Sequence, residues 1–338
     1  MNQTIILIFL TLLSLIIIFF INEFRIIISQ KTKLIDTPNN IRKFHQKDTP
    51  LLGGLMIFLT FFLINMYLFF FETIDRVDHI IFYTSSCCFF LGLIDDSKNL
   101  SYKYKFYSLI ILFTFFVSLE PNLQLTKIYF VTLNKYIYLG DYSIFFTVLC
   151  LILLTNAINL IDGIDGLCIT INIILFTWLV LTFQNIGSFY IIMIISLFFL
   201  LLLNLKRNIF IGDSGSLFLG SLIGLLLIYS YNNQLLITNY PVENIFIILM
   251  LPGIDMFRVF FQRILKKRNP FSPDRIHLHY LLFDQPLKLN IIYVIFLILC
   301  LTPILLNFYT NIKQFQIILG YTTIYLLLIF AIDKSKIK

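Results

Sequence analysis

The chain has 338 residues, of which 59% are apolar and only 13% are charged. Soluble domains carry about 25% charged residues, so this composition excludes a soluble protein and indicates an integral membrane protein. The net charge of +7 does not predict nucleic-acid binding, because the basic residues follow the loops on one side of the predicted membrane domain.

Eleven apolar stretches predict an all-α, polytopic membrane fold. A membrane-spanning helix needs about 20 residues, with a range of about 17–25. About eleven transmembrane helices are therefore expected, at 4–24, 51–71, 79–95, 104–120, 143–161, 168–185, 188–205, 212–231, 243–262, 290–308 and 314–332. With no soluble domain and no clear internal repeat, residues 1–338 are predicted to form a single integral-membrane domain.

The distribution of Lys and Arg predicts the orientation of the chain. Alternating loops place 25–50, 96–103, 156–167, 206–211, 263–289 and the tail 333–338 on one side. Of the 25 Lys and Arg residues, only Arg76, Lys127, Lys135 and Lys313 fall on the other side. Because cytoplasmic loops are enriched in basic residues, the N-terminus is predicted outside, and the C-terminus with every motif-rich loop on the cytoplasmic side.

The first cytoplasmic loop combines basic residues with a pair of glycines. Lys43 and His45 lie in a basic run, and Thr49 shortly precedes Gly53 and Gly54. An ordinary positive-inside loop would explain the basic residues alone. Glycine is unfavourable in a helix, so the pair at the start of a span indicates close backbone approach to a ligand or to a neighbouring helix. Basic side chains beside it are suited to phosphate.

The second loop, 95–105, begins with two adjacent carboxylates, Asp95 and Asp96. Consecutive side chains of a helix point about 100° apart, so one carboxylate can face a metal and the other a substrate. Like charges this close raise the pKa of one of them, which suits a general base. The alternative interpretation is a solvated helix end.

The third loop carries two amides and two carboxylates directly after an apolar run. Asn156, Asn159 and Asp162 recur every three residues and share roughly one helix face, and we expect Gly163 to break the helix and bring Asp165 back. A charged residue in a lipid-facing helix costs about 2.5–3.5 kcal/mol, so a loop that is acidic by chance is the weaker interpretation. Amide and carboxylate oxygens at this density suit a hard cation such as magnesium.

The fourth loop, 206–216, ends in the run Gly212-Asp213-Ser214-Gly215-Ser216 at the start of a span. This run is typical of a helix N-terminus with a capping residue. Free amides and an acid at that position can also hold a metal–phosphate pair. Ser214 lacks the strand–turn–helix context of a hydrolase nucleophile.

The fifth loop, 263–289, contains the sequence Asp274-Arg275-Ile276-His277-Leu278-His279, and the span before it contains Asp255 and Arg258. A single His in a loop has little meaning. Two His separated by one residue, beside Arg275 and on the same side as the acidic motifs, indicate a phosphate-binding clamp.

Taken together in this order, the five motifs resemble the polyprenyl-phosphate N-acetylhexosamine-1-phosphate transferase family. The resemblance extends from Asp36 to His279. It is closest to the undecaprenyl-phosphate GlcNAc-1-phosphate transferases that begin O-antigen, common-antigen or teichoic-acid synthesis. The runs 42–46 and 270–279 favour this subgroup over the phospho-MurNAc-pentapeptide translocases, which usually carry adjacent histidines in the fifth loop. Many relatives have a further His where this chain has Tyr280.

The resemblance implies an enzyme of the bacterial inner (plasma) membrane, with its site on the cytoplasmic face. It would transfer a sugar-1-phosphate from a UDP-N-acetylhexosamine to undecaprenyl phosphate and release UMP, with Mg²⁺ as cofactor or Mn²⁺ in its place. By carry-over, the metal ligands are Asn159 and Asp213. The catalytic residues are Asp95, Asp96, Asp162, Asp165, His277 and His279, and the substrate-binding residues are Lys43, His45, Thr49, Asn156 and Arg275.

Other functions remain open from the sequence. UDP-QuiNAc, UDP-FucNAc or a MurNAc-pentapeptide donor would use the same chemistry. A secondary transporter also carries acids within its spans, but it predicts mid-span polar residues and a repeat, whereas the acids here gather at one face. A homodimer is compatible with the sequence, which does not settle the oligomeric state.

Overall fold

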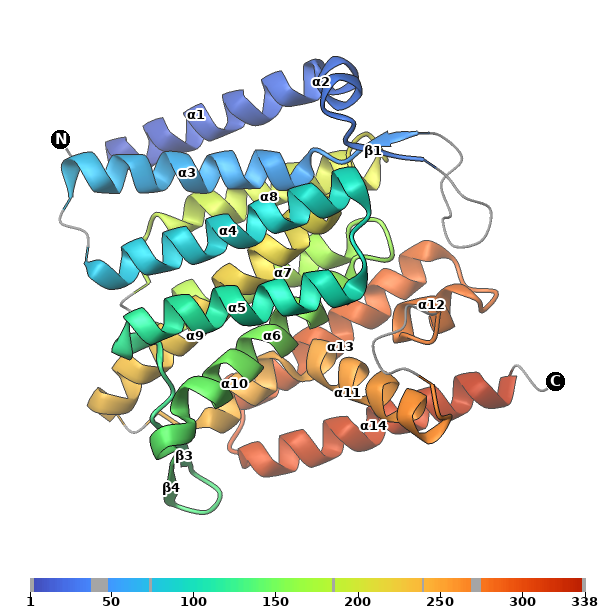
Figure 1. The fold of residues 1–338 in the computed structure, drawn as a ribbon. Coiled ribbons are helices and arrows are strands. Elements are labelled where there is room, and N and C mark those ends of the chain that lie inside the picture. The colour runs from blue at the N-terminus through green and yellow to red at the C-terminus, as the bar shows by residue number, and fades with distance from the viewer. Residues whose placement is uncertain are drawn as a thin grey trace. The chain divides into compact units, whose positions relative to one another are not determined.

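Figure 1 shows the fold of the chain in a computed structural model. It describes residues 3–37, 48–72, 75–183, 186–238, 240–268 and 275–335. The chain divides into two compact units, Met1–Gln124 with Ile144–Asn232 and Leu125–Ser143 with Asn233–Lys338, which we call unit 1 and unit 2. The single-domain prediction stays a prediction, since these units are defined by contacts rather than by independent folding.

Unit 1 is built from helices rich in Ile, Leu and Phe. A helix forms all of its backbone hydrogen bonds within itself, as the lipid interior requires. The helices of unit 1 are α1 (Gln3–Glu23), α2 (Arg25–Thr32), α3 (Gly53–Phe71), α4 (Arg76–Lys98), α5 (Tyr102–Leu119), α6 (Ser143–Ile161), α7 (Leu167–Thr182), α8 (Tyr190–Leu205) and α9 (Gly212–Thr238). The only strands described in this unit are the short antiparallel pair β1 (Ile35–Asp36) and β2 (Thr49–Pro50), in which Asp36 lies opposite Thr49.

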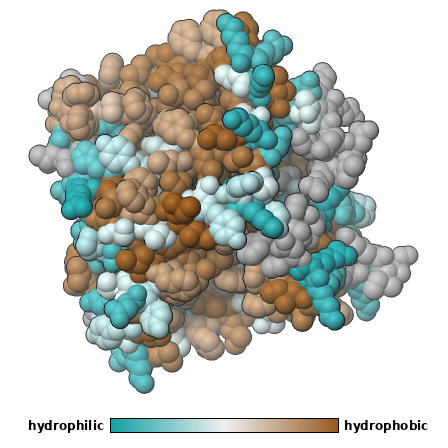
Figure 2. Space-filling view, viewed as in Figure 1, coloured by the Kyte–Doolittle hydropathy of each residue, from teal (hydrophilic) through white to brown (hydrophobic). Residues whose placement is uncertain are grey.

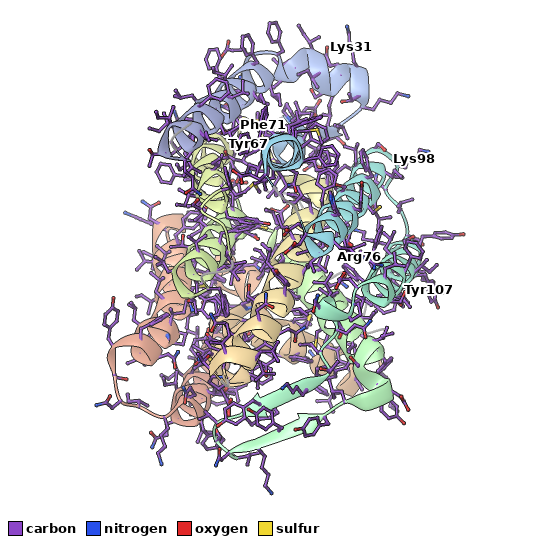
Figure 3. The ribbon with its side chains drawn as sticks, turned by 90° about the vertical axis from the view of Figure 1, so that its left-hand side faces the viewer. Lys31, Tyr67, Phe71, Arg76, Lys98 and Tyr107 are labelled. Carbon is purple, nitrogen blue, oxygen red and sulfur yellow. The ribbon has the colours of Figure 1, made fainter. Side chains whose placement is uncertain are left out.

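Neighbouring helices of unit 1 surround α9. Helices α1, α3, α7 and α8 form one connected group, and α4 packs along α5. The exposed side chains of α1 and α3 are largely apolar, whereas Lys31 of α2 is exposed (Figures 2 and 3). In contrast, nearly every side chain of α9 from Gly212 to Tyr231 is buried. Helix α9 is therefore the core of unit 1, and the other helices present apolar faces to the surroundings.

Aromatic side chains accompany the connection from α3 to α4. The rings of Tyr67 and Phe71 stack with centroids 5.3 Å apart near the end of α3, and Arg76 opens α4 (Figure 3). Lys98 marks the other end of α4, directly before the turn into α5. Because α4 is continuous between these residues, its acidic C-terminal turn is held at a fixed distance from the Arg76 end.

Glycines allow α9 to lie close to its neighbours. The amides of Gly53 and Gly54 donate to the carbonyls of Phe210 and Ile211, both at 2.9 Å. A Cβ on Gly54 would collide with the backbone of Gly215. Gly53 and Gly54 were predicted to allow close approach either of a ligand or of a neighbouring helix. In the structure they lie against a neighbouring segment, the start of α9.

In its described residues, unit 2 contains a hairpin, a short 3-10 helix (Gly140–Tyr142) and five α-helices. The hairpin pairs β3 (Lys127–Phe130) with β4 (Lys135–Tyr138), and Glu243 accepts from the turn amides of Val131 and Thr132 at 3.2 and 3.0 Å. The helices are α10 (Val242–Ile248), α11 (Met250–Leu265), α12 (Leu278–Phe283), α13 (Leu289–Tyr309) and α14 (Gln314–Ser335). A bend of 78° separates α10 from α11.

The prediction of an all-α, multi-pass membrane protein is confirmed. In the described part of the chain, eight helices are long and apolar enough to cross a membrane, or nine if α10 and α11 count as one bent span. The two remaining predicted spans correspond to α7 and α8, which have 16 residues each. At about 1.5 Å per residue these helices fall short of a hydrocarbon core of about 30 Å. The count of eleven and the orientation stay predictions.

The packing of α9 on α6 generates a stability prediction at Gly220. A Cβ at this position would lie 2.8 Å from the Cα of Thr155, and overpacking of this kind costs about 1–3 kcal/mol. We expect Gly220→Ala to lower the melting temperature of the purified protein in detergent. Gly320 has no atom within 4 Å of its added Cβ, so Gly320→Ala is the matched control. Equal melting temperatures for the two variants would contradict the close crossing.

Candidate active site

The turn between α4 and α5 fixes the first acidic side chain. Helix α4 ends where Asn99 adopts a left-handed conformation (φ 52°) and its amide donates to the carbonyl of Asp95 at 2.7 Å. Asn is one of the few residues that tolerate this conformation at a helix C-terminus. The amide of Leu100 donates to Asp95 Oδ1 at 2.7 Å. The other oxygen of the buried Asp95 carboxylate is therefore the one left to face α5.

A lysine of α5 lies between two carboxylates. Lys105 Nζ forms an ion pair with Asp95 Oδ2 and another with Asp213 Oδ2, the latter at 2.6 Å. The Asp95 side chain is 6% exposed and that of Asp213 is 33% exposed. The ammonium group of Lys105 thereby joins helices α4, α5 and α9 at one point. It also neutralises the repulsion between the carboxylates of Asp95 and Asp213.

The second carboxylate, Asp96, caps the N-terminus of α9. Asp96 Oδ1 accepts from the amide of Asp213 at 2.7 Å, and Oδ2 accepts from the amide of Ser214 at 3.0 Å. Gly212 has φ +70°, and an added Cβ there would lie 2.6 Å from Asp96 Oδ2. A carboxylate at this position is favoured by the helix dipole. The N-terminus of α9 is capped as expected, but the capping carboxylate comes from α4. The amides of Asp213 and Ser214 are therefore already hydrogen-bonded.

The polar face of α6 brings Asn159 to Asp213. Asn159 Nδ2 donates to Asp213 Oδ1 at 2.6 Å and to Ser216 Oγ at 2.8 Å. Asn156, one turn earlier, instead donates to the carbonyl of Ile152 of its own helix at 2.8 Å. The two predicted metal ligands therefore lie in contact, whereas Asn156 is held by its own backbone.

The chain breaks its helix after Asn159, as the glycine predicted. Helix α6 ends at Ile161, and the amide of Gly163 folds back to the carbonyl of Ile161 at 2.7 Å. Asp162 is exposed. Although part of this side chain reaches the surface, the protein packed around it disfavours the charge, and with Asp213 and other carboxylates nearby the pKa of Asp162 is raised well above its ordinary value. The structure thus adds a further acid to the neighbourhood of Asp213.

The other acid of this loop is held by the end of α8. Arg207 Nε donates to Asp165 Oδ2 at 2.7 Å. The buried Asn204 accepts from the amide of Gly166 and donates to the carbonyl of Ile209 at 2.9 Å. Two loops that are far apart in the sequence are therefore tied through one amide side chain.

Unit 2 contains its own buried polar cluster, centred on Asp255 of α11. Its Oδ1 accepts from Arg258 Nη2 at 2.8 Å, from the amide of Leu278 at 3.0 Å and from the hydroxyl of Tyr325 at 2.6 Å. Its Oδ2 lies 2.8 Å from His277 Nδ1. Four donors around one carboxylate anchor the start of α12 to α11 and α14.

The second histidine of the fifth loop stacks on the first. The rings of His277 and His279 are nearly parallel, with centroids 5.8 Å apart, and the buried Nε2 atom of each ring has no hydrogen-bond partner among the described residues. Burial lowers the pKa of His279 to about 3, so this imidazole is neutral at physiological pH. His279 can therefore offer a hydrogen bond but not a positive charge. In the predicted phosphate-binding clamp, the positive charge would have to come from another residue.

The remaining predicted residues are dispersed. Arg275 pairs with Asp284 at 2.9 Å and lies over the ring of Tyr280, 5.4 Å from its centroid. Thr49 is buried in β2. Lys43 and His45 lie outside the described residues.

Sequence reasoning missed three residues that organise these sites: Lys105, Asn204 and Tyr325. Lys105 was counted only as a basic residue near a loop. A signal for it existed, because a lysine within a predicted span is itself unusual. Asn204 and Tyr325 give no comparable signal, since a polar residue near a span end and a tyrosine within a span are both ordinary.

Comparison with known proteins places these acidic motifs in a family. The sequence model of glycosyl transferase family 4 matches residues 79–231, which run from the first turn of α4 to within α9. A relative from Bacillus subtilis (strain 168), named probable undecaprenyl-phosphate N-acetylglucosaminyl 1-phosphate transferase, is 31% identical over 313 residues, covering 90% of this chain and 84% of its own length. The chain belongs to glycosyl transferase family 4.

Two further relatives are also similar to this family 4 transferase. Both are named undecaprenyl-phosphate alpha-N-acetylglucosaminyl 1-phosphate transferase. The one from Escherichia coli (strain K12) is 28% identical over 75% of this chain and 70% of its own length. The one from Thermotoga maritima is 28% identical, with 78% of each chain covered. The family and the transferase class predicted from the motifs are confirmed.

The ion-pair network of this transferase generates a prediction at Lys105. Lys105→Met would leave Asp95 and Asp213 facing each other without a cation. Removing one partner of a buried pair costs about 3–5 kcal/mol, and the partial exposure of Asp213 reduces this cost. We expect a lower melting temperature in detergent than for Lys103→Met, which alters an exposed lysine of the same helix. Indistinguishable melting temperatures would show that the bridge contributes nothing.

Proposed function

We propose that the protein transfers N-acetylglucosamine-1-phosphate from UDP-GlcNAc to undecaprenyl phosphate and releases UMP. This would be the first membrane step of cell-envelope polysaccharide synthesis, on the cytoplasmic face of the bacterial inner membrane. The names of the relatives support the acceptor and the sugar. The observation that carries the proposal is the meeting of Asp95, Lys105 and Asp213 with Asn159, which gathers both signs of charge at one point of a membrane protein.

The proposed reaction needs positioning and charge neutralisation more than covalent help. An oxygen of the lipid phosphate attacks the phosphorus that carries the sugar. A new P–O bond forms, and the bond from that phosphorus to the oxygen of the UMP phosphate breaks, so UMP leaves with the bonding electron pair. Asp95 would orient the lipid phosphate or accept its proton, and Lys105 would neutralise phosphate charge.

A divalent cation fits the residues around Asp213. Mg²⁺ prefers oxygen ligands and is often held by one or two carboxylates together with substrate phosphates. No group of three or more His, Cys, Asp or Glu side chains in the described residues forms a metal site by itself. The Lys105 ammonium between Asp95 and Asp213 indicates that this pair accepts positive charge. Asp213 and Asn159 would hold Mg²⁺, and the ion when bound would stabilise the charge that develops on the diphosphate.

The other residues receive substrate roles in the proposal. Asp162 and Asp165 would hold the nucleotide-sugar, with Asp165 fixed by Arg207. Arg275, His277 and His279 would bind phosphate or sugar, His279 as a neutral hydrogen-bonding group. Asp96 would place Asp213 through the start of α9. Lys43, His45, Thr49 and Asn156 remain proposed substrate contacts.

Loss of either bridged carboxylate should stop transfer. We expect Asp95→Asn and Asp213→Asn each to lower the rate of lipid-linked sugar-phosphate formation by about 100-fold or more, the range for removing one transition-state contact. The measurement is extraction of labelled lipid product with purified protein in detergent. Asp141→Asn, at an exposed position, is the control for a change of charge alone. Full turnover in both site variants would refute the assignment.

Removal of divalent cations should also stop sugar-phosphate transfer, and this loss should be reversible. With excess EDTA we expect no transfer from UDP-GlcNAc, and added Mg²⁺ or Mn²⁺ should restore it. A panel of UDP-GlcNAc, UDP-QuiNAc, UDP-FucNAc and UDP-MurNAc-pentapeptide in the restored assay tests the donor. Turnover that is insensitive to EDTA would contradict the metal, and preference for another sugar would correct the donor.

A further inference from the structure

The hydroxyl of Tyr325 occupies the centre of the polar cluster in unit 2. Tyr325 lies on α14 and is fully buried. Its hydroxyl donates to Asp255 Oδ1 at 2.6 Å and accepts from Arg258 Nε at 2.9 Å. One hydroxyl thus bridges the two members of an ion pair and uses both its donor and its acceptor capacity.

The same ion pair holds the segment that carries His277. Arg258 Nη2 donates to the carbonyl of Ile276 at 2.6 Å, and the amide of Leu278 donates to Asp255 Oδ1 at 3.0 Å. His277 is therefore fixed on both sides through its neighbours in the chain. Its own Nδ1 lies 2.8 Å from Asp255 Oδ2.

The surroundings of Asp255 determine the state of the His277 ring. Because a guanidinium, a hydroxyl and an amide all donate to Asp255, its side chain acts as a carboxylate acceptor. Nδ1 of His277 then carries the proton, since the partner of one ring nitrogen sets the tautomer. The buried Nε2 has no hydrogen-bond partner in the described part of the chain, so it is the ring nitrogen left for a ligand.

We propose that Tyr325 is a positioning residue for donor binding: by bridging Asp255 and Arg258, its hydroxyl fixes the orientation and tautomer of His277. The inference rests on the proposed function in one respect, that His277 binds the phosphate or sugar of the donor. It gives the C-terminal helix α14 a direct part in the site of unit 2. No contact between Tyr325 and a substrate is required.

Helix α14 also supplies a matched control. Tyr321 lies one turn before Tyr325 and is 7% exposed, but no residue that the structure describes hydrogen-bonds to its buried hydroxyl. Tyr325→Phe and Tyr321→Phe therefore remove the same atom from neighbouring buried rings and preserve the rest of the packing. Only the first substitution breaks the bridge between Asp255 and Arg258.

Steady-state kinetics with purified full-length protein provide the first test. A hydrogen bond to a charged group shifts an equilibrium within the protein by about tenfold or more, and apparent affinity falls with the population of the binding-competent arrangement. We expect Tyr325→Phe to raise the KM for UDP-GlcNAc about tenfold and to leave the KM for undecaprenyl phosphate unchanged. Tyr321→Phe should match the wild type in both. A merely structural role of Tyr325 would lower the melting temperature and the active fraction with both KM values unchanged, and that result would overturn the inference.

Nitrogen NMR of ¹⁵N-histidine-labelled protein in detergent provides a readout without turnover. The chain has four His residues, and His277→Gln identifies the signal of His277. In the wild type we expect one signal with the proton fixed on Nδ1, and in Tyr325→Phe a shifted or averaged signal, with Tyr321→Phe unchanged. Spectra that coincide for all three proteins would overturn the positioning role.

The two tests separate the inference from the proposed function. If the wild type makes no lipid-linked product from any UDP-sugar, the proposed function fails, while the NMR comparison still decides whether Tyr325 fixes His277. If the wild type is active and Tyr325→Phe equals Tyr321→Phe in both readouts, the inference alone fails.

Discussion

The meeting of one ammonium group with two carboxylates is the interaction on which unit 1 depends. Lys105 contacts Asp95 and Asp213, which lie on helices separated by more than a hundred residues of sequence. Charged groups inside an apolar helical protein are costly unless they are paired. The pairing therefore explains how three polar side chains are tolerated there, and it fixes the ends of α4, α5 and α9 relative to one another.

Backbone contacts between glycines and α9 make this meeting possible. The carboxylate of Asp96 reaches the first amides of α9 because Gly212 has no side chain, and Gly92 of α4 lies against the carbonyl of Asp213. Gly54 gives α3 the same close approach to Gly215. A larger residue at any of these positions would separate the helices and move Asp213 away from its partners, so the site is built by helix packing as much as by the acidic residues.

Unit 2 also contains a buried carboxylate, which is stabilised by different groups. Its carboxylate, Asp255, is surrounded by a guanidinium, a phenol, an imidazole and a backbone amide. These partners come from α11 itself, from the start of α12 and from α14, so the cluster forms only when these three elements have packed. The imidazoles of His277 and His279 are consequently oriented before any ligand binds, which lowers the ordering cost of binding.

The sequence predicted the helices and most of the acidic residues, because both carry strong local signals. Apolar length identifies spans, and Asp95, Asn159 and Asp213 stand out since polar groups are rare near lipid. The divergence of Asp95 and Asp96 also followed from helix geometry, and the two side chains do reach different partners. What the sequence could not predict is pairing at a distance. Lys105, Asn204 and Tyr325 acquire their partners only through tertiary packing. The position of Lys105 within a predicted span marks it as unusual, but it does not name Asp95 and Asp213 as its partners.

A double-mutant cycle between Lys105 and Asp213 tests the central claim most directly. The free energy of unfolding would be measured for the wild type, Lys105→Met, Asp213→Asn and the double variant, in the same detergent. Directly contacting charged residues couple by about 0.5–3 kcal/mol, so we predict that the double variant is less destabilised than the sum of the two single variants by an amount in this range. Strict additivity would mean that the two side chains do not interact, and the proposed convergence of α4, α5 and α9 would be wrong.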